Sequence, residues 1–141
     1  MNTGFQKTYY TSRPGQIYEE WFEVGGIREG VYRKYNASGY INMCCHYVRG
    51  KRTGEFSMYY EPDGIAIMPE EGKNHGPLFV HGYLVDDKKN GPHRTFYING
   101  KVKQLAVYKD NVLEGPMQLF TPEGEPKAYD RVVPMMRPAT L

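Results

Sequence analysis

The chain has 141 residues, of which 40% are hydrophobic and 24% are charged, and its formal net charge at pH 7 is +2. These values are typical of one folded domain and argue against a disordered chain, and the charge is too small to indicate nucleic-acid binding by itself. With 16 glycines and 10 prolines, the chain is expected to form many turns and no long helices.

The lack of a recognisable targeting signal and the positions of the cysteines predict a cytoplasmic location. Residues 1–7 lack the apolar core of a secretion signal, and no apolar run approaches the length of a membrane-spanning segment. The two cysteines, Cys44 and Cys45, are adjacent, so they cannot form a stabilising disulfide framework. We therefore predict a cytoplasmic protein with reduced thiols.

Glycines mark an internal repeat along the chain. Five units begin at Gly4, Gly30, Gly54, Gly91 and Gly115. An aromatic residue stands five positions after each of these glycines, at Tyr9, Tyr35, Tyr59, Phe96 and Phe120. A second glycine follows in each unit, at Gly15, Gly39, Gly64, Gly100 and Gly124. A fixed spacing of this kind predicts a stacked repeat architecture.

The first two units show the expected form of each repeat. The first unit is degenerate, as a capping unit often is. In the second, two strands rich in aromatic and β-branched residues, 30–35 and 40–47, flank a turn at 36–39, which predicts a β-hairpin. Ile41, Met43, Cys45 and Tyr47 alternate along the second strand and are expected to share one face.

The glycine that opens each unit has a proposed role in this scheme. A glycine at a strand start leaves a gap beside the backbone, and an aromatic ring of a neighbouring strand can cover it. The five recurring aromatic residues are therefore expected to form a packed ladder, although an aromatic stripe that binds a ligand is the alternative.

The third unit departs from the period. The basic spacing is 24 residues, as from Gly30 to Gly54 and from Gly91 to Gly115, but Gly54 and Gly91 are 37 residues apart. The extra residues form an insertion at about 68–79. The fourth unit is again regular, and the fifth runs into a C-terminal tail at 134–141. One repeat domain over 1–133 is the expected organisation.

The repeat resembles the MORN repeat. The pattern is Gly-x-Tyr-x-x-Tyr-x-x-x-Gly, an alternating apolar strand, and then Tyr-x-x-Gly-Lys-x-x-Gly. The best match runs from Gly30 to Gly54, and the length of each unit resembles the bacterial and viral variant of the family. The resemblance implies an all-β fold: an elongated, curved, open-ended antiparallel sheet of consecutive β-hairpins. It also implies a mostly non-enzymatic protein, such as an adaptor, a membrane-proximal scaffold, or an immunity or antitoxin partner.

Two surfaces are candidates for binding. The first is the insertion and the strand that follows it, with the partner-binding candidates Glu70, Glu71, Lys73, His75, Phe79 and His81. Long loops on regular scaffolds often carry binding residues, but they are also tolerated without a role. The second is a basic edge formed by turns between units, with Arg28, Arg49, Lys51, Arg52, Lys88 and Lys89. This edge can bind anionic lipid, or it can simply be a solvated edge that prevents aggregation.

The residues provide little basis for catalysis. His46, His75, His81 and His93 lack metal-ligand spacing, and Cys45 and His46 point to opposite faces of a strand. We therefore expect no catalytic residues, no metal, no cofactor and no enzymatic activity.

The sequence predicts a protein-binding module, which includes an immunity, antitoxin or viral inhibitor of another protein. Binding of anionic lipid headgroups through the basic edge is the alternative. Nucleic acid is not an expected partner, and self-association through the sheet ends is a third hypothesis because open edges can pair.

Overall fold

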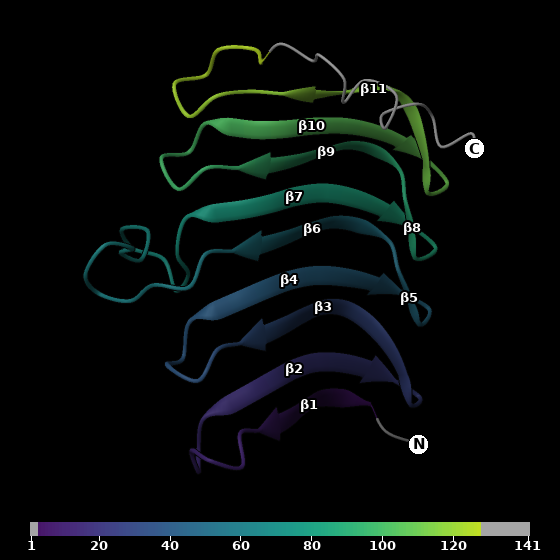
Figure 1. The fold of residues 1–141 in the computed structure, drawn as a ribbon. Helices are drawn as coiled ribbons and strands as arrows, with labels where there is room; N and C mark the ends of the chain where they lie inside the picture. Colours follow the sequence, from purple (N-terminus) through teal and green to yellow (C-terminus); the bar gives the residue numbers. More distant parts are fainter. Residues whose placement is uncertain (1–2, 128–141) are drawn as a thin grey trace.

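The computed structural model describes residues 3–127, which form one antiparallel sheet (Figure 1). Its strands are β1 (Gly4–Tyr9), β2 (Ile17–Val24), β3 (Ile27–Tyr35), β4 (Ile41–Val48), β5 (Lys51–Arg52), β6 (Gly54–Tyr59), β7 (Leu78–Val85), β8 (Lys88–Lys89), β9 (Gly91–Phe96), β10 (Val102–Lys109) and β11 (Val112–Leu119). The predicted tail at 134–141 lies outside the described residues.

The sheet follows the chain without crossovers. Its order is β1-β2-β3-β4-β6-β7-β9-β10-β11, and the short strands β5 and β8 extend the hairpins at β4 and β7. The sheet is curved and does not close, so β1 and β11 lie at opposite ends (Figure 1). The predicted all-β, open-ended sheet of consecutive hairpins is confirmed. Within residues 3–127, no helix is long and apolar enough to cross a membrane.

Cross-strand register shows that the units are equivalent. The opening glycine of each of the first four units pairs with the penultimate residue of the second strand of its unit: Gly4 with Glu23, Gly30 with Tyr47, Gly54 with Leu84, and Gly91 with Tyr108. The recurring aromatic residues pair near its start: Tyr9 with Ile17, Tyr35 with Ile41, Tyr59 with Leu78, and Phe96 with Val102.

A bulge in each of these hairpins changes which residues share a face. Lys34 pairs with Met43 but Tyr35 pairs with Ile41, so one residue of β4 is left out of the ladder. Directly paired residues share a face. Ile41 therefore lies with Tyr35 and Cys44 on one face, which we name face B. The prediction that Ile41 shares a face with Met43 and Cys45 was wrong because alternation does not persist through a bulge.

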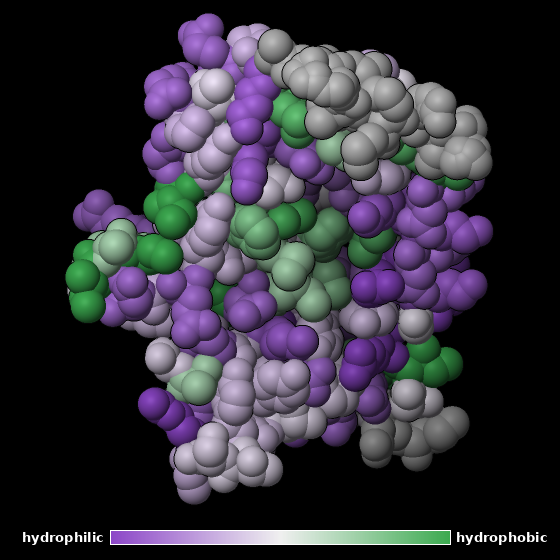
Figure 2. Space-filling view, in the orientation of Figure 1, coloured by the Kyte–Doolittle hydropathy of each residue, from purple (hydrophilic) through white to green (hydrophobic). Residues whose placement is uncertain are grey.

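The opposite face, face A, carries the most buried side chains. Tyr32 and Cys45, which pair across β3 and β4, are 5% and 2% exposed. The other buried hydrophobic residues among those described are Leu84, Ala106 and Leu113. Burial raises the pKa of the Cys45 thiol to about 11, so this thiol stays protonated at neutral pH. Figure 2 shows a hydrophobic area over the central strands of the visible face.

Backbone conformation, rather than cover by a ring, explains the opening glycines. Gly30 has a φ of 89° and Gly115 has a φ of 74°, a region that side chains disfavour. Nothing lies within 4 Å of a Cβ added to either residue. The expectation that aromatic rings cover the opening glycines was therefore wrong for Gly30 and Gly115. At Gly91, a carbon of the Tyr83 ring does lie 3.7 Å from the added Cβ, although Tyr83 is not one of the five recurring aromatic residues. A ring does cover Gly82, where the imidazole of His93 lies against the backbone of β7.

Tyrosines link successive units beyond the strand ladders. The hydroxyl of Tyr10 donates to the backbone carbonyl of Tyr35 at 2.7 Å. The hydroxyl of Tyr97 makes the same bond to Phe120, also at 2.7 Å. In the second unit, the buried Asn36 takes the tyrosine's place, and its side-chain oxygen accepts from the Ser38 and Tyr40 amides within its own turn.

Stability is expected to fall as the pH is lowered through the range of histidine titration. Burial lowers the pKa of His93 below its ordinary value of 6.5, while a bond to the Tyr83 carbonyl partly opposes this. The unfolded chain therefore binds a proton more readily than the folded chain, and the stability present above pH 6.5 is lost as the pH falls. Urea unfolding at pH 7.5 and 5.5 should show this loss, and His93→Gln should reduce it. An equal loss in the variant would contradict this assignment.

Candidate binding surface on the insertion loop

The connection from β6 to β7, residues 60–77, projects from one edge of the sheet (Figure 1). The sequence placed the insertion at 68–79, but Leu78 and Phe79 belong to β7, whereas residues 65–67 lie in the loop. An apolar run such as Ile65-Ala66-Ile67 is typical of a strand. These residues form a turn instead, because their backbone amides donate hydrogen bonds to the Asp63 side chain.

Asp63 organises the tip of the loop. Its carboxylate accepts hydrogen bonds from the amides of Ile65, Ala66 and Ile67 at 2.8–3.0 Å. The Ile67 carbonyl in turn accepts the amides of Asp63 and Gly64. The backbone donors lower the pKa of Asp63, so the carboxylate remains charged and bonded at neutral pH. The tip is therefore a defined turn.

This turn presents apolar side chains to solvent. Ile65 is 88% exposed and Met68 is 57% exposed. The space-filling view shows hydrophobic surface on the part of the molecule that projects to the left, where the loop lies in Figure 1 (Figure 2). Ile98, in the neighbouring turn between β9 and β10, is 48% exposed. The edge thus carries three large apolar residues.

The second half of the loop is attached to the preceding unit. The Asn74 carbonyl accepts the Ile41 amide at 2.8 Å, and the Asn74 side chain donates to the Gly39 carbonyl at 3.3 Å. The ring of His75 stacks on Tyr59 with a centroid separation of 3.9 Å. The Tyr60 amide donates to the Pro77 carbonyl, which closes the base of the loop. The loop therefore bridges the edges of β4 and β6.

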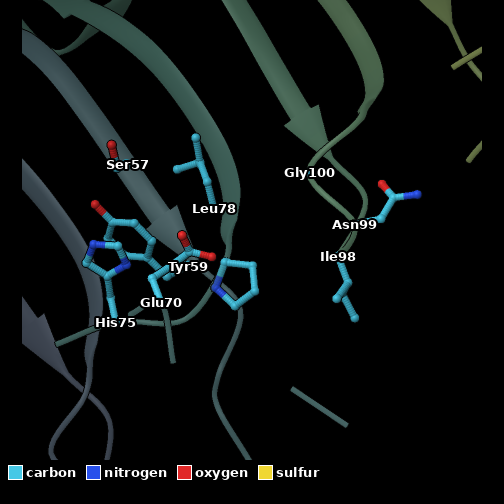
Figure 3. Close-up of a pocket in the computed structure, with 9 residues that line it drawn as sticks. Ser57, Tyr59, Glu70, His75, Leu78, Ile98, Asn99 and Gly100 are labelled. Atoms are coloured by element: carbon cyan, nitrogen blue, oxygen red, sulfur yellow. The ribbon is translucent and has the colours of Figure 1, made fainter. Parts of the chain in front are cut away.

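A cavity of about 400 Å³ lies between the loop and the turn that joins β9 to β10. Tyr59, His75 and Glu70 lie on one side, and Ile98 and Asn99 lie on the other (Figure 3). The remaining lining residues are Ser57, Pro77, Leu78 and Gly100. The wall is mixed, with stacked rings, an acid and an amide, so it offers both apolar contact and hydrogen-bonding groups.

The structure brings together two of the six partner-binding candidates. Glu70 and His75 both line the cavity, and the Glu70 amide donates to the His75 carbonyl. Glu71 and Lys73 are exposed in the turn between them, and the Lys73 amide donates to the Glu70 carbonyl.

The other two candidates lie on β7. Phe79 packs against Tyr60 with ring centroids 4.8 Å apart. His81 contacts the Glu55 carboxylate on β6 at 3.1 Å. Neither residue lines the cavity.

The predicted basic edge carries charges of both signs. Hydrogen bonds join its turns in series, since the Arg28 carbonyl accepts the Gly50 amide and the Arg52 carbonyl accepts the Asp87 amide. Arg52 also pairs with the Asp87 carboxylate at 2.9 Å. Asp86 and Asp110 lie in turns at the same edge. The six basic residues are therefore interleaved with acids.

Residues 3–127 contain no group of three or more His, Cys, Asp or Glu side chains that is placed to hold a metal ion. Burial raises the pKa of Cys44 as well as that of Cys45, which disfavours both thiolates.

Comparison with known proteins returned no match, either to a protein-family model or to a curated protein. The resemblance to MORN repeats therefore rests on the glycine and aromatic pattern of the sequence. That pattern predicts the hairpins, but it does not include the exposed residues at the loop edge, Ile65, Met68 and Ile98. The only sequence signal for the tip is an aspartate three residues after Tyr60, followed by a glycine and apolar residues.

Proposed function

We propose that this chain is a non-enzymatic protein-binding module that engages its partner with the edge formed by the insertion loop and the turn at Ile98. The observation that carries the proposal is the exposure of Ile65 and Met68 on a turn whose backbone amides donate three hydrogen bonds to the Asp63 carboxylate. Exposed apolar groups on a preorganised turn lose little conformational freedom on binding, so more of their burial contributes to affinity.

The resemblance to MORN repeats supports this reading. We take the chain to be a member of that class, in which a rigid hairpin sheet displays an interaction surface. The resemblance extends the proposal to an immunity, antitoxin or viral inhibitor that blocks another protein by covering it. Recognition of a protein, rather than of anionic lipid, is favoured because Asp86, Asp87 and Asp110 interrupt the basic edge.

The test compares two double variants of the full chain. The loop variant carries Ile65→Ser and Met68→Ser, and the control carries Val85→Ser and Val112→Ser, which replace apolar residues of 47% and 48% exposure elsewhere. Each variant is used to capture proteins from cells of the native host, and the captured protein is then purified. Its affinity for the loop variant is expected to be about 30-fold weaker than for the wild type, which is the effect of losing about 2 kcal/mol at a binding hot spot.

The control should retain wild-type affinity. The proposal fails if the loop variant and the wild type bind the purified partner equally. It also fails if the wild type captures no protein but binds vesicles of anionic lipid in a separate sedimentation assay. Because all four positions are solvent-exposed, loss of folding is not expected to explain a difference between the variants.

A further inference from the structure

The side chain of Arg28 on β3 lies among three aromatic rings. Its guanidinium carbon is 4.5 Å from the ring centroid of Trp21, 5.2 Å from that of Tyr32 and 5.5 Å from that of Tyr47. The rings also contact one another, since Trp21 stacks with Tyr32 and Tyr47 meets Tyr32 edge-on. We name these three residues the aromatic cage.

The cage differs from the other cation–ring contacts of the described chain. Lys34, Lys89 and Lys103 each approach a single tyrosine. Only Arg28, among residues 3–127, is shared by three rings. Several rings around one cation are the arrangement that proteins use to recognise methylated ammonium groups.

Acidic groups hold the rings and add negative charge. The Glu23 carboxylate accepts a hydrogen bond from the indole nitrogen of Trp21 at 2.8 Å, and the Glu19 carboxylate accepts one from the hydroxyl of Tyr32. These bonds fix two rings independently of Arg28. Tyr32 is buried, whereas Trp21 and Tyr47 are only half-buried, so the cage is accessible from solvent.

Arg28 is held by the rings rather than by an ion pair. Its polar contact is with the Tyr47 hydroxyl at 3.3 Å, and within residues 3–127 no carboxylate oxygen lies within 4.0 Å of its guanidinium nitrogens. Its removal therefore leaves no buried acid without its partner, and the bonds to Glu19 and Glu23 remain to hold the rings.

We propose that the aromatic cage is a binding site for an organic cation, either a guanidinium or a methylated ammonium group, which Arg28 occupies in the free chain. An external cation takes the same position when Arg28 moves out. Because Arg28 belongs to the same chain as the rings, it competes for the cage at a high effective concentration. It therefore lowers the apparent affinity of the cage for an external cation. This inference goes beyond the proposed function and does not depend on the insertion loop.

Trp21 is the only tryptophan of the chain, so its fluorescence reports directly on the cage. Arg28→Ala is titrated with ethylguanidinium chloride and, separately, with tetramethylammonium chloride, with sodium chloride as the reference for ionic strength. We expect a saturable change in emission, at concentrations at least 10-fold lower than the wild type requires. The more tightly bound salt identifies the preferred cation.

Two further variants control for the site. Arg33→Ala removes an arginine on the opposite face of β3 and should respond like the wild type. Adding Tyr47→Ala to Arg28→Ala should abolish saturation. If Arg28→Ala does not fold, as judged by circular dichroism, Arg28→Gln replaces it. A folded Arg28 variant whose response to both organic salts equals its response to sodium chloride would overturn the proposal.

Discussion

Gly82→Ala is expected to lower the free energy of unfolding by about 3 kcal/mol, the upper part of the range for overpacked interiors. A Cβ at Gly82 would lie 2.6 Å from Cε1 and 2.8 Å from Cγ of His93. His93 cannot move aside easily, because its ring also contacts Phe56 at 5.2 Å and Tyr108 at 5.1 Å between centroids. Urea unfolding followed by circular dichroism measures the loss.

A double-mutant cycle separates this collision from other effects. His93→Ala removes the ring that the new methyl group would meet, so Gly82→Ala should cost much less in that background. If Gly82→Ala costs the same with and without His93, then the ring contact is not the reason for the glycine.

Gly76→Ala is expected to have an effect of similar size, about 3 kcal/mol, because the obstacle is backbone. A Cβ there would overlap the carbonyl oxygen of Tyr60 and would lie 3.2 Å from the ring of Pro62. The base of the loop would have to open, which breaks the bond between the Tyr60 amide and the Pro77 carbonyl. Limited proteolysis at Lys73 and urea unfolding should both detect the change.

Gly72→Ala is the matched control in the same loop. Gly72 has open space around it and a φ of 72°, so alanine there meets only the conformational cost of about 1 kcal/mol. Similar losses for the two substitutions would show that the Tyr60 carbonyl does not constrain residue 76.

The repeat made the architecture predictable from sequence. The opening glycines and the aromatic residues five positions later are local signals, and each corresponds to a fixed place in a hairpin. The predicted faces were less accurate, because one unpaired residue in a strand places the residues before it on the opposite face from the one that simple alternation predicts. Ile41 shows this, since it lies on face B although its spacing from Cys45 predicts face A.

The candidate site was predictable only in part. Glu70 and His75 were identified from their place in an irregular segment, and both line the cavity. Asn99 and Ile98 come from the next repeat, where nothing in the sequence marks them. The hydrogen bond between the Ile41 amide and the Asn74 carbonyl joins residues 33 positions apart through backbone atoms. Because every residue except proline has both of these backbone groups, such a bond cannot be predicted from residue types.

The attachment of the loop at Asn74 has a consequence for cooperativity. In a linear repeat, each unit contacts only its neighbours, so unfolding spreads as one event only if every junction is strong. The paired residues between β4 and β6 are Met43 with Met58 and Cys44 with Ser57. The loop adds bonds from Asn74 to Ile41 and Gly39 across this short junction. It therefore acts as a clip across this one junction, so that a partner bound to the loop would strengthen the coupling between the hairpin β3–β4 and the hairpin β6–β7.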